Sequence, residues 1–385
     1  MKHGNSIARH GILGKIPLTL QWDLTYDCNS ECIYCRSKGF KNYSSDLCLS
    51  ADQIEKIVEQ LARWNFRRIK LLGGEPLLHK HIFDIISLCK KKDIKTTLFT
   101  NTRKINYNLL LKLKENGLND IIFSIDSMDE SENNYLRSPN AYQSSINALN
   151  SYQDLFEKNC DLPHLHINST MTKVNKNGLL SLLDLSQAYS VSTYNFSLLD
   201  GGSIESNLFT EIALNEAEII EVIEKILIKS RKLGVKSFVS GLKPLAALYF
   251  SKTCDYELPV VYSGCKGGFT NFFMYPDGKM WPCQRTAEGY NIKYPKYKYK
   301  YVKILDNIEF SLQNEWTEFR EFVGKDNYLV NSWPCNNCKF AYWICRPCPL
   351  EKTVSDMTKV GVCYSVAKKI GGHLNDLINE HFNIE

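Results

Sequence analysis

Short apolar segments alternate with amphipathic segments six times along the first 233 residues, and this alternation limits the possible fold more than any other feature. The apolar segments have the length and composition of β-strands and cover residues 18–26, 68–72, 95–100, 120–125, 164–171 and 194–199. Helical periodicity covers residues 51–64, 81–92, 107–116, 141–158, 179–189 and 214–232. Ser50 is placed to cap the first helix, and Gly117 and Gly234 are placed to end the third and the last. Six β–α units in succession predict an α/β fold in which right-handed crossovers curl a parallel sheet into a partial (β/α)6 barrel of the TIM type.

Residues that could bind a cofactor or take part in catalysis follow the predicted strands. Cys28 follows the first strand, a Gly-Gly-Glu-Pro turn follows the second, Asn101 follows the third, and Ser124 and Asp126 close the fourth. Because the active site of such barrels lies at the C-terminal ends of the strands, we expect these residues to meet in one site.

Composition indicates the compartment of the protein and the partners that it does not bind. The first residues contain no apolar core of a secretory signal, and no apolar run reaches the length of a membrane span, so we expect a cytoplasmic protein that binds no membrane. A net charge of +5 on 385 residues is too small to indicate nucleic-acid binding. Thiols stay reduced in the cytoplasm, so the 14 cysteines favour metal binding over disulfides.

Cys28, Cys32 and Cys35 lie within eight residues. Three thiolates can hold a [4Fe–4S] cluster and leave one iron open for another ligand. A structural zinc ion would take four ligands, and a catalytic zinc site would normally use histidine. Chance crowding of buried cysteines is the remaining interpretation, and the position at a strand end disfavours it.

With Tyr34 directly before its third cysteine, this motif resembles that of the radical S-adenosylmethionine (SAM) enzymes. The resemblance implies a [4Fe–4S] cluster whose open iron binds the amino and carboxylate groups of SAM. It also implies reductive cleavage of SAM to a 5′-deoxyadenosyl radical that abstracts a hydrogen atom from the substrate. The motif assigns no further catalytic residue.

Other positions match SAM contacts of the same family. Gly73, Gly74, Glu75 and Pro76 resemble the family's GGEP motif, which implies a role in holding the methionine amino group of SAM. Glycines allow the main chain to approach a ligand closely. The resemblance further implies a ribose contact at Ser124 and Asp126, a carboxylate contact at Arg137, and cofactor contacts at Asn101 and Asn168. Thr102 stands where the family's Thr-Asn-Gly motif has glycine.

A second group of cysteines begins after the predicted barrel. Two CxxC pairs occur here, a pattern that indicates metal binding and is also typical of a zinc ribbon. The order of seven cysteines resembles the SPASM domain of many radical SAM maturases, although the last two gaps are six and two residues where that family has five and three. The resemblance implies two auxiliary [4Fe–4S] clusters, one held by Cys265, Cys283 and Cys348 with Cys254 as a candidate fourth ligand, and one by Cys335, Cys338, Cys345 and Cys363.

These features divide the chain into five parts. We expect an N-terminal extension at 1–17, the barrel at 18–235, a connector at 236–253, the SPASM-type domain at 254–365 and a C-terminal helix at 366–385. Because the segment before the first strand is short, we expect no fused leader-peptide recognition domain there.

The resemblance implies an oxidoreductase or maturase that modifies a ribosomally made peptide or protein by crosslinking, oxidation or epimerisation. Its partners would be a reductant such as flavodoxin or ferredoxin and a separate leader-peptide recognition protein. Two alternatives remain open. One is a radical SAM dehydrogenase or epimerase of a small molecule such as a sugar or cyclitol. The other is a zinc-binding nucleic-acid or scaffold protein that uses the CxxC pairs and an arm of alternating tyrosines and lysines at 297–303.

Overall fold

A computed structural model describes residues 17–37, 49–158, 161–199, 206–240, 242–258, 266–287, 301–306, 316, 335–340, 345, 359–370 and 374–382. Within these residues one curved sheet forms the centre of the fold, in the strand order β10-β9-β8-β1-β2-β3-β4-β5-β6-β7. The strands β1 to β7 pair with their neighbours in parallel, as the predicted barrel requires. The α/β fold with a partial parallel barrel is therefore confirmed.

The parallel strands lie close to their predicted positions. They are β1 (Leu18–Thr25), β2 (Phe66–Gly73), β3 (Lys95–Thr100), β4 (Asp120–Ser124), β5 (His164–Met171), β6 (Val191–Leu198) and β7 (Ser237–Ser240). Side chains alternate along them. Ile69 and Leu71 of β2 are fully buried, whereas Lys70 between them and Leu72 after them are partly exposed, and Leu72 lines the cavity described below.

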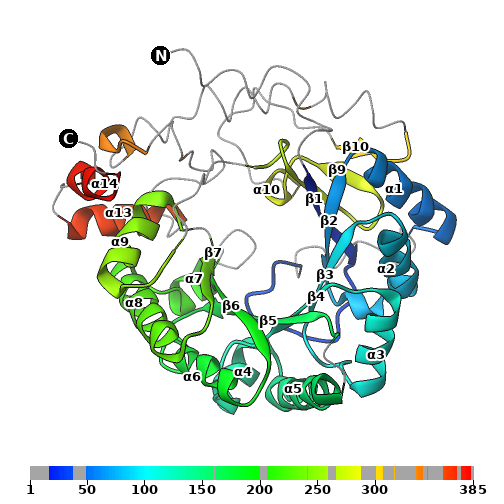
Figure 1. Ribbon diagram of the computed structural model, residues 1–385, viewed down its shortest axis with the longest axis horizontal. Helices are drawn as coiled ribbons and strands as arrows, with labels where there is room; N and C mark the ends of the chain where they lie inside the picture. The colour runs from blue at the N-terminus through cyan, green and yellow to red at the C-terminus, as the bar shows by residue number, and fades with distance from the viewer. Residues whose placement is uncertain are drawn as a thin grey trace.

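Helices form a layer outside the curved row of strands (Figure 1). They are α1 (Ala51–Arg63), α2 (Ile82–Lys91), α3 (Tyr107–Asn116), α4 (Glu130–Arg137), α5 (Ala141–Lys158), α6 (Leu179–Asp184), α7 (Ser206–Ile212), α8 (Glu216–Leu233) and α9 (Pro244–Cys254), with single 3₁₀ turns at Pro76–Leu78 and Leu185–Gln187. Ser50 forms a capping box with Gln53 at the start of α1. Gly117 and Gly234 end α3 and α8 with positive φ angles, so all three predicted caps are confirmed.

Two parts of the sheet differ from prediction. The range expected to be a connector contains β7 and α9, which extend the barrel by a seventh β–α unit. From the cysteine-rich region, β8 (Asn271–Met274) pairs in parallel with β1 and continues into the antiparallel strands β9 (Lys279–Trp281) and β10 (Val302–Lys303). The sheet therefore joins the two predicted domains.

The C-terminal segments pack beside the end of the barrel. A single helix is expected there, but the structure has α13 (Lys359–Lys369) and α14 (Leu374–Phe382). Helix α13 packs against α8 and α9, and α14 packs against α9. The short helix α10 (Gln284–Ala287) follows β9, and a 3₁₀ turn covers Cys335–Asn337.

Candidate active site

A cavity of about 400 Å³ lies where the C-terminal ends of β2 to β6 meet the cysteine loop that follows β1. Most of the predicted cofactor and metal residues of the barrel line it: Cys28, Cys32, Tyr34, Cys35, Gly73, Gly74, Glu75, Asn101, Ser124, Arg137 and Asn168. Pro76 and Asp126 do not line it. The strand ends therefore bring most of the predicted residues to one cavity, and their roles in binding a cofactor or metal stay predictions.

The three thiols lie on one loop but differ in exposure, since Cys32 is buried, Cys35 is half-buried and Cys28 is exposed. Burial raises the pKa of Cys32 to about 11, while Arg137 opposes this shift. Among the residues that the structure describes, no three histidine, cysteine, aspartate or glutamate side chains converge as ligands of one metal ion. A [4Fe–4S] cluster does not need such convergence, because each of its thiolates binds a different iron. Three thiolates beside a cavity fit a cluster with one open iron, whereas a structural zinc ion would take a fourth ligand.

The Gly-Gly-Glu-Pro turn is hydrogen-bonded to the start of the cysteine loop. The Gly74 N–H donates to the Thr25 carbonyl (2.6 Å), and the Glu75 N–H donates to the Asp27 carbonyl (2.8 Å). A Cβ atom on Gly74 would lie 2.2 Å from the Asp27 carbonyl oxygen, and Gly73 has a φ of +129°. Both positions therefore require glycine for the loop and the turn to meet.

Glu75 links the turn to β3 and to the loop after it. Its carboxylate accepts hydrogen bonds from the Leu77 N–H (3.1 Å), the Thr100 hydroxyl (3.0 Å) and the Asn101 N–H (2.8 Å). The side chain is almost fully buried, and this burial raises the pKa of Glu75 to about 7. Both carboxylate oxygens thus already have partners within the protein, and contact with the methionine amino group of SAM stays a prediction.

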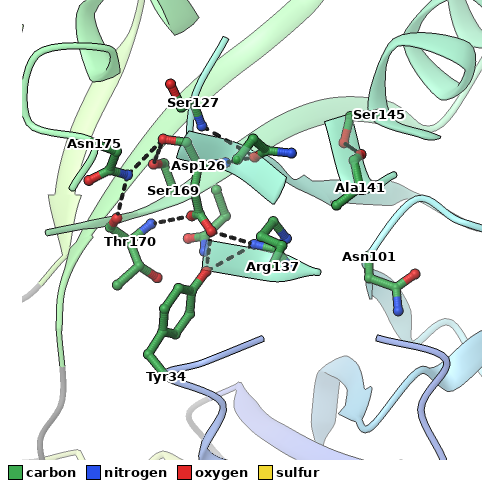
Figure 2. Close-up of polar contacts among 12 residues, drawn as sticks. Tyr34, Asn101, Asp126, Ser127, Arg137, Ala141, Ser145, Ser169, Thr170 and Asn175 are labelled. Atoms are coloured by element: carbon green, nitrogen blue, oxygen red, sulfur yellow. Dashed lines mark hydrogen bonds and ion pairs between the residues drawn. The ribbon is translucent and has the colours of Figure 1, made fainter. Parts of the chain in front are cut away.

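A compact hydrogen-bonded triad consists of Tyr34 and Arg137, which line the cavity, and of Asp126, to which both are bonded (Figure 2). One carboxylate oxygen of Asp126 accepts hydrogen bonds from the Tyr34 hydroxyl and from Nη1 of Arg137 (3.0 Å), and the other accepts from the Thr170 N–H (2.8 Å). Nη1 of Arg137 also donates to the Tyr34 hydroxyl (3.1 Å). Asp126 is 0% exposed and does not line the cavity, and its contact with the ribose of SAM stays a prediction.

Three side chains at the cavity wall can donate hydrogen bonds to a ligand: those of Arg137, Ser124 and Asn168. Arg137 lines the cavity, and among the described residues its Nε and Nη2 atoms have no partner. The Ser124 hydroxyl likewise has no partner within this part of the chain. Asn168 accepts hydrogen bonds at Oδ1 from Asn195 and Ser197, which turns its amide nitrogen away from β6. These three residues therefore offer hydrogen-bond donors at the cavity wall.

A comparison with protein families identifies the part of the chain that forms most of this cavity. The model of the Radical SAM superfamily matches residues 22–177. That range contains the cysteine loop, the Gly-Gly-Glu-Pro turn and the triad. Residues 22–177 form a radical SAM domain.

The chain is also similar to named proteins over longer stretches of its sequence. The chain is 23% identical to Fe-coproporphyrin III synthase of Methanosarcina barkeri over 61% of this chain and 55% of that protein. It is 24% identical to a probable GTP 3′,8-cyclase of Sulfolobus acidocaldarius over 81% of this chain and 90% of that protein. The chain spans about half of the length of the first relatives that it matches.

Two solved structures share the fold at low sequence identity. SuiB of Streptococcus suis, bound to its precursor peptide SuiA, has a TM-score of 0.66 at 17% identity, over 88% of this chain and 74% of that chain. The enzyme anSMEcpe with bound AdoMet and Cp18Cys peptide has a TM-score of 0.64 at 18% identity, over 96% of this chain and all of that chain.

Several residues of the radical SAM domain that the sequence did not single out hold the cysteine loop in place. Nε of Arg103 donates to the Ser30 hydroxyl (2.9 Å), and its Nη2 donates to the Ser138 hydroxyl (2.8 Å). Arg36 forms an ion pair with the fully buried Asp23 of β1 (3.0 Å). Arg103 comes two residues after Asn101, so its position at a strand end was the available signal.

The C-terminal cysteines are placed only in part. Cys335, Cys338 and Cys345 lie close enough to Cys363 to raise its pKa, together with the larger effect of burial. These four cysteines therefore lie in one neighbourhood, and their role as ligands of a second auxiliary cluster stays a prediction. Of the predicted first group, Cys265 and Cys348 lie outside the described residues, whereas Cys283 follows β9.

Cys254 lies at the end of α9, where its thiol faces the Glu224 carbonyl of α8 (3.9 Å). Its charged neighbours are Glu224 and Lys369, and no other described cysteine affects its pKa. A ligand role for Cys254 stays a prediction.

No helix in the described parts of the chain has the length and apolar character needed to cross a membrane.

Proposed function

We propose that this chain is a radical SAM enzyme that holds a [4Fe–4S] cluster through Cys28, Cys32 and Cys35 and acts on a peptide substrate. The observation that carries the proposal is that these thiols, the Gly-Gly-Glu turn and Arg137 line one cavity at the strand ends of a radical SAM domain. When bound and reduced, the cluster with SAM supplies a 5′-deoxyadenosyl radical that removes a hydrogen atom from a substrate. The residues of the chain bind, orient and enclose the reactants.

The cavity wall supports binding of SAM in a defined orientation. Within the described residues Nε and Nη2 of Arg137 have no partner and match a carboxylate, and the hydrogen bonds of Nη1 to Asp126 and Tyr34 orient the guanidinium. Ser124 and Asn168 present neutral donors on the neighbouring strands β4 and β5, which suit hydroxyl and ring-nitrogen acceptors. Charge therefore meets the amino-acid end of SAM, and neutral donors meet its nucleoside end.

A peptide substrate is supported by the fold and by the cysteine-rich region. Two proteins of similar fold have solved structures with bound peptides. The grouping of Cys335, Cys338 and Cys345 around Cys363 supports an auxiliary cluster. Such a cluster can take the electron that a substrate radical loses during a two-electron oxidation.

A small-molecule substrate is the second candidate. The alignment with the probable GTP 3′,8-cyclase covers 90% of that relative, so a nucleotide is the first small molecule to test.

The test uses the full chain, reconstituted with iron and sulfide without oxygen, reduced with dithionite and supplied with SAM. We expect iron and sulfide to bind and 5′-deoxyadenosine to form, and the Cys28→Ala/Cys32→Ala/Cys35→Ala variant to form none. Zinc without iron in the reconstituted protein, or undiminished 5′-deoxyadenosine from the triple variant, would refute the cluster assignment. Deuterium transfer into 5′-deoxyadenosine from labelled peptides or from labelled GTP then distinguishes the two substrate classes.

A further inference from the structure

We propose that Asn101 raises the reduction potential of the cluster bound by Cys28, Cys32 and Cys35, through a hydrogen bond to the Cys28 sulfur. The inference rests on the proposed function, because it requires that Cys28 is a cluster ligand. The structure places Nδ2 of Asn101 3.6 Å from Sγ of Cys28, within the range of hydrogen bonds to sulfur. Asn101 is 9% exposed, so water competes little for this contact.

The hydrogen bonds around Asn101 determine which end of its amide faces the sulfur. Its Oδ1 accepts from the Arg103 N–H (3.1 Å), so this atom is the acceptor. Its Nδ2 donates to Oδ1 of Asn29 (2.8 Å) as well as to Cys28. Because the other orientation would put a donor against the Arg103 N–H, the network assigns the N–H groups to the side of the cysteine loop.

The backbone of Asn101 is held as firmly as its side chain. Its N–H donates to the buried carboxylate of Glu75 (2.8 Å). The next residue, Thr102, has a φ of +72°, a left-handed conformation that is unfavourable for a β-branched residue. Hydrogen bonds from its hydroxyl to the Asn101 carbonyl (2.6 Å) and with Ser145 (3.2 Å) hold this conformation. Figure 2 shows Asn101 on its own side of the site, apart from the triad of Tyr34, Asp126 and Arg137. The protein therefore maintains a strained turn that keeps the amide beside the cysteine loop.

A donor at this position has a predictable effect on electron transfer. Reduction adds one negative charge to the cluster and its thiolates, and a hydrogen bond to a ligand sulfur stabilises that charge more than it stabilises the oxidised form. Loss of the donor should therefore lower the potential. Asn101 acts through Cys28 in this proposal, so it is a positioning residue rather than a catalytic one.

The experiment measures the reduction potential of the reconstituted full chain without SAM, by redox titration followed by electron paramagnetic resonance. The signal to follow is the component that Cys28→Ala removes, which separates it from any auxiliary cluster. We expect Asn101→Ala to make one-electron reduction about tenfold less favourable, which is a shift of about 59 mV to a lower potential. Asn101→Asp has the same shape without the donor and should shift the potential at least as far. Asn147→Asp, on the exposed surface of α5, is the matched control and should leave the potential unchanged.

The outcomes separate this inference from the proposed function. An unchanged potential in Asn101→Ala with full iron content would overturn the tuning role and leave the cluster assignment intact. Failure of both Asn101 variants to assemble the cluster would also overturn it, because Asn101 would then be needed for assembly rather than for tuning. Absence of the Cys28-dependent signal from the unmodified protein would refute the proposed function itself.

Discussion

Asp126→Ala should destabilise the protein strongly, because it removes the counter-ion of a buried arginine. The Asp126 side chain is 0% exposed and that of Arg137 is 10% exposed, with 3.0 Å between Oδ2 and Nη1. In the variant, the guanidinium keeps its charge but loses its only ionic partner among the described residues. The Tyr34 hydroxyl and the Thr170 N–H lose their acceptor at the same time.

The size of the effect follows from the burial of the pair. Removal of one partner from a buried ion pair costs about 3–5 kcal/mol of unfolding free energy. Tyr34→Phe removes one neutral donor from the same carboxylate and should cost only about 1 kcal/mol. The double variant Asp126→Ala/Arg137→Met should cost less than the sum of the two single variants, because no buried charge is left unpaired.

Urea unfolding followed by circular dichroism measures these differences in unfolding free energy. The midpoints are compared between variants whose unfolding curves have the same slope. Glu221→Ala is the control: it breaks an exposed ion pair with Lys225 on α8 and should leave the midpoint unchanged. If the curve of Asp126→Ala overlays that of Glu221→Ala, or if the two single-variant costs add fully in the double variant, the triad does not stabilise the site as argued here.

Two further perturbations test other parts of the site. Gly74→Ala should prevent the turn from meeting the cysteine loop and lower the iron content of the reconstituted protein, because its Cβ would lie 2.2 Å from the Asp27 carbonyl oxygen. Gly234→Ala is the control, since an added Cβ there meets no atom within 4 Å. It should cost about 1 kcal/mol of unfolding free energy from its positive φ and leave the iron content unchanged. Burial lowers the pKa of His79 to about 4 from 6.5, so between these values the unfolded chain binds more protons at this site, and His79 should contribute a loss of roughly 3 kcal/mol of unfolding free energy as pH drops from 6.5 to 4. Glu75, with its pKa raised to about 7, changes stability in the opposite direction over the same range, so the measurement is the difference in unfolding free energy between the unmodified protein and His79→Asn. This difference should change by roughly 3 kcal/mol between pH 6.5 and 4, and a constant difference would contradict the assignment.

Local patterns predicted the elements whose periodicity is strong. Strands β3 and β5 and helices α3 and α5 have the predicted bounds. Burial alternates along β5, and α3 and α5 bury residues at helical spacing, which is the pattern that the sequence shows. Helix α9 was missed because it is buried almost all round and so lacks an amphipathic stripe. Helix α4 was missed for the opposite reason, since it is mostly polar, yet it carries Arg137 into the site. The pairing of β8 with β1 depends on a contact between distant segments that no local pattern contains.

The site shows the same division between what residue types can and cannot predict. Motif positions predicted which residues gather at the strand ends, but not which of their polar atoms remain free for a ligand. Asp126 and the carboxylate of Glu75 were expected to contact SAM; the structure shows them bonded to protein groups, and their contacts with SAM stay predictions. This distinction depends on burial and hydrogen-bond partners, which come from elements far apart in the sequence.

These internal bonds explain how the cysteine loop keeps its shape. The loop is tied to three successive strand ends by a different kind of contact at each: the Gly74 turn after β2, the Asn101 amide after β3 and the Asp126 carboxylate after β4. Each contact belongs to a residue whose motif first suggested cofactor binding. If the protein rather than the ligand satisfies these groups, the cavity exists before SAM arrives, and little binding energy is lost in ordering the loop. Glu75 and Asp126 then contribute to SAM binding indirectly, because they hold Asn101, Arg137 and the loop of the three thiols in position.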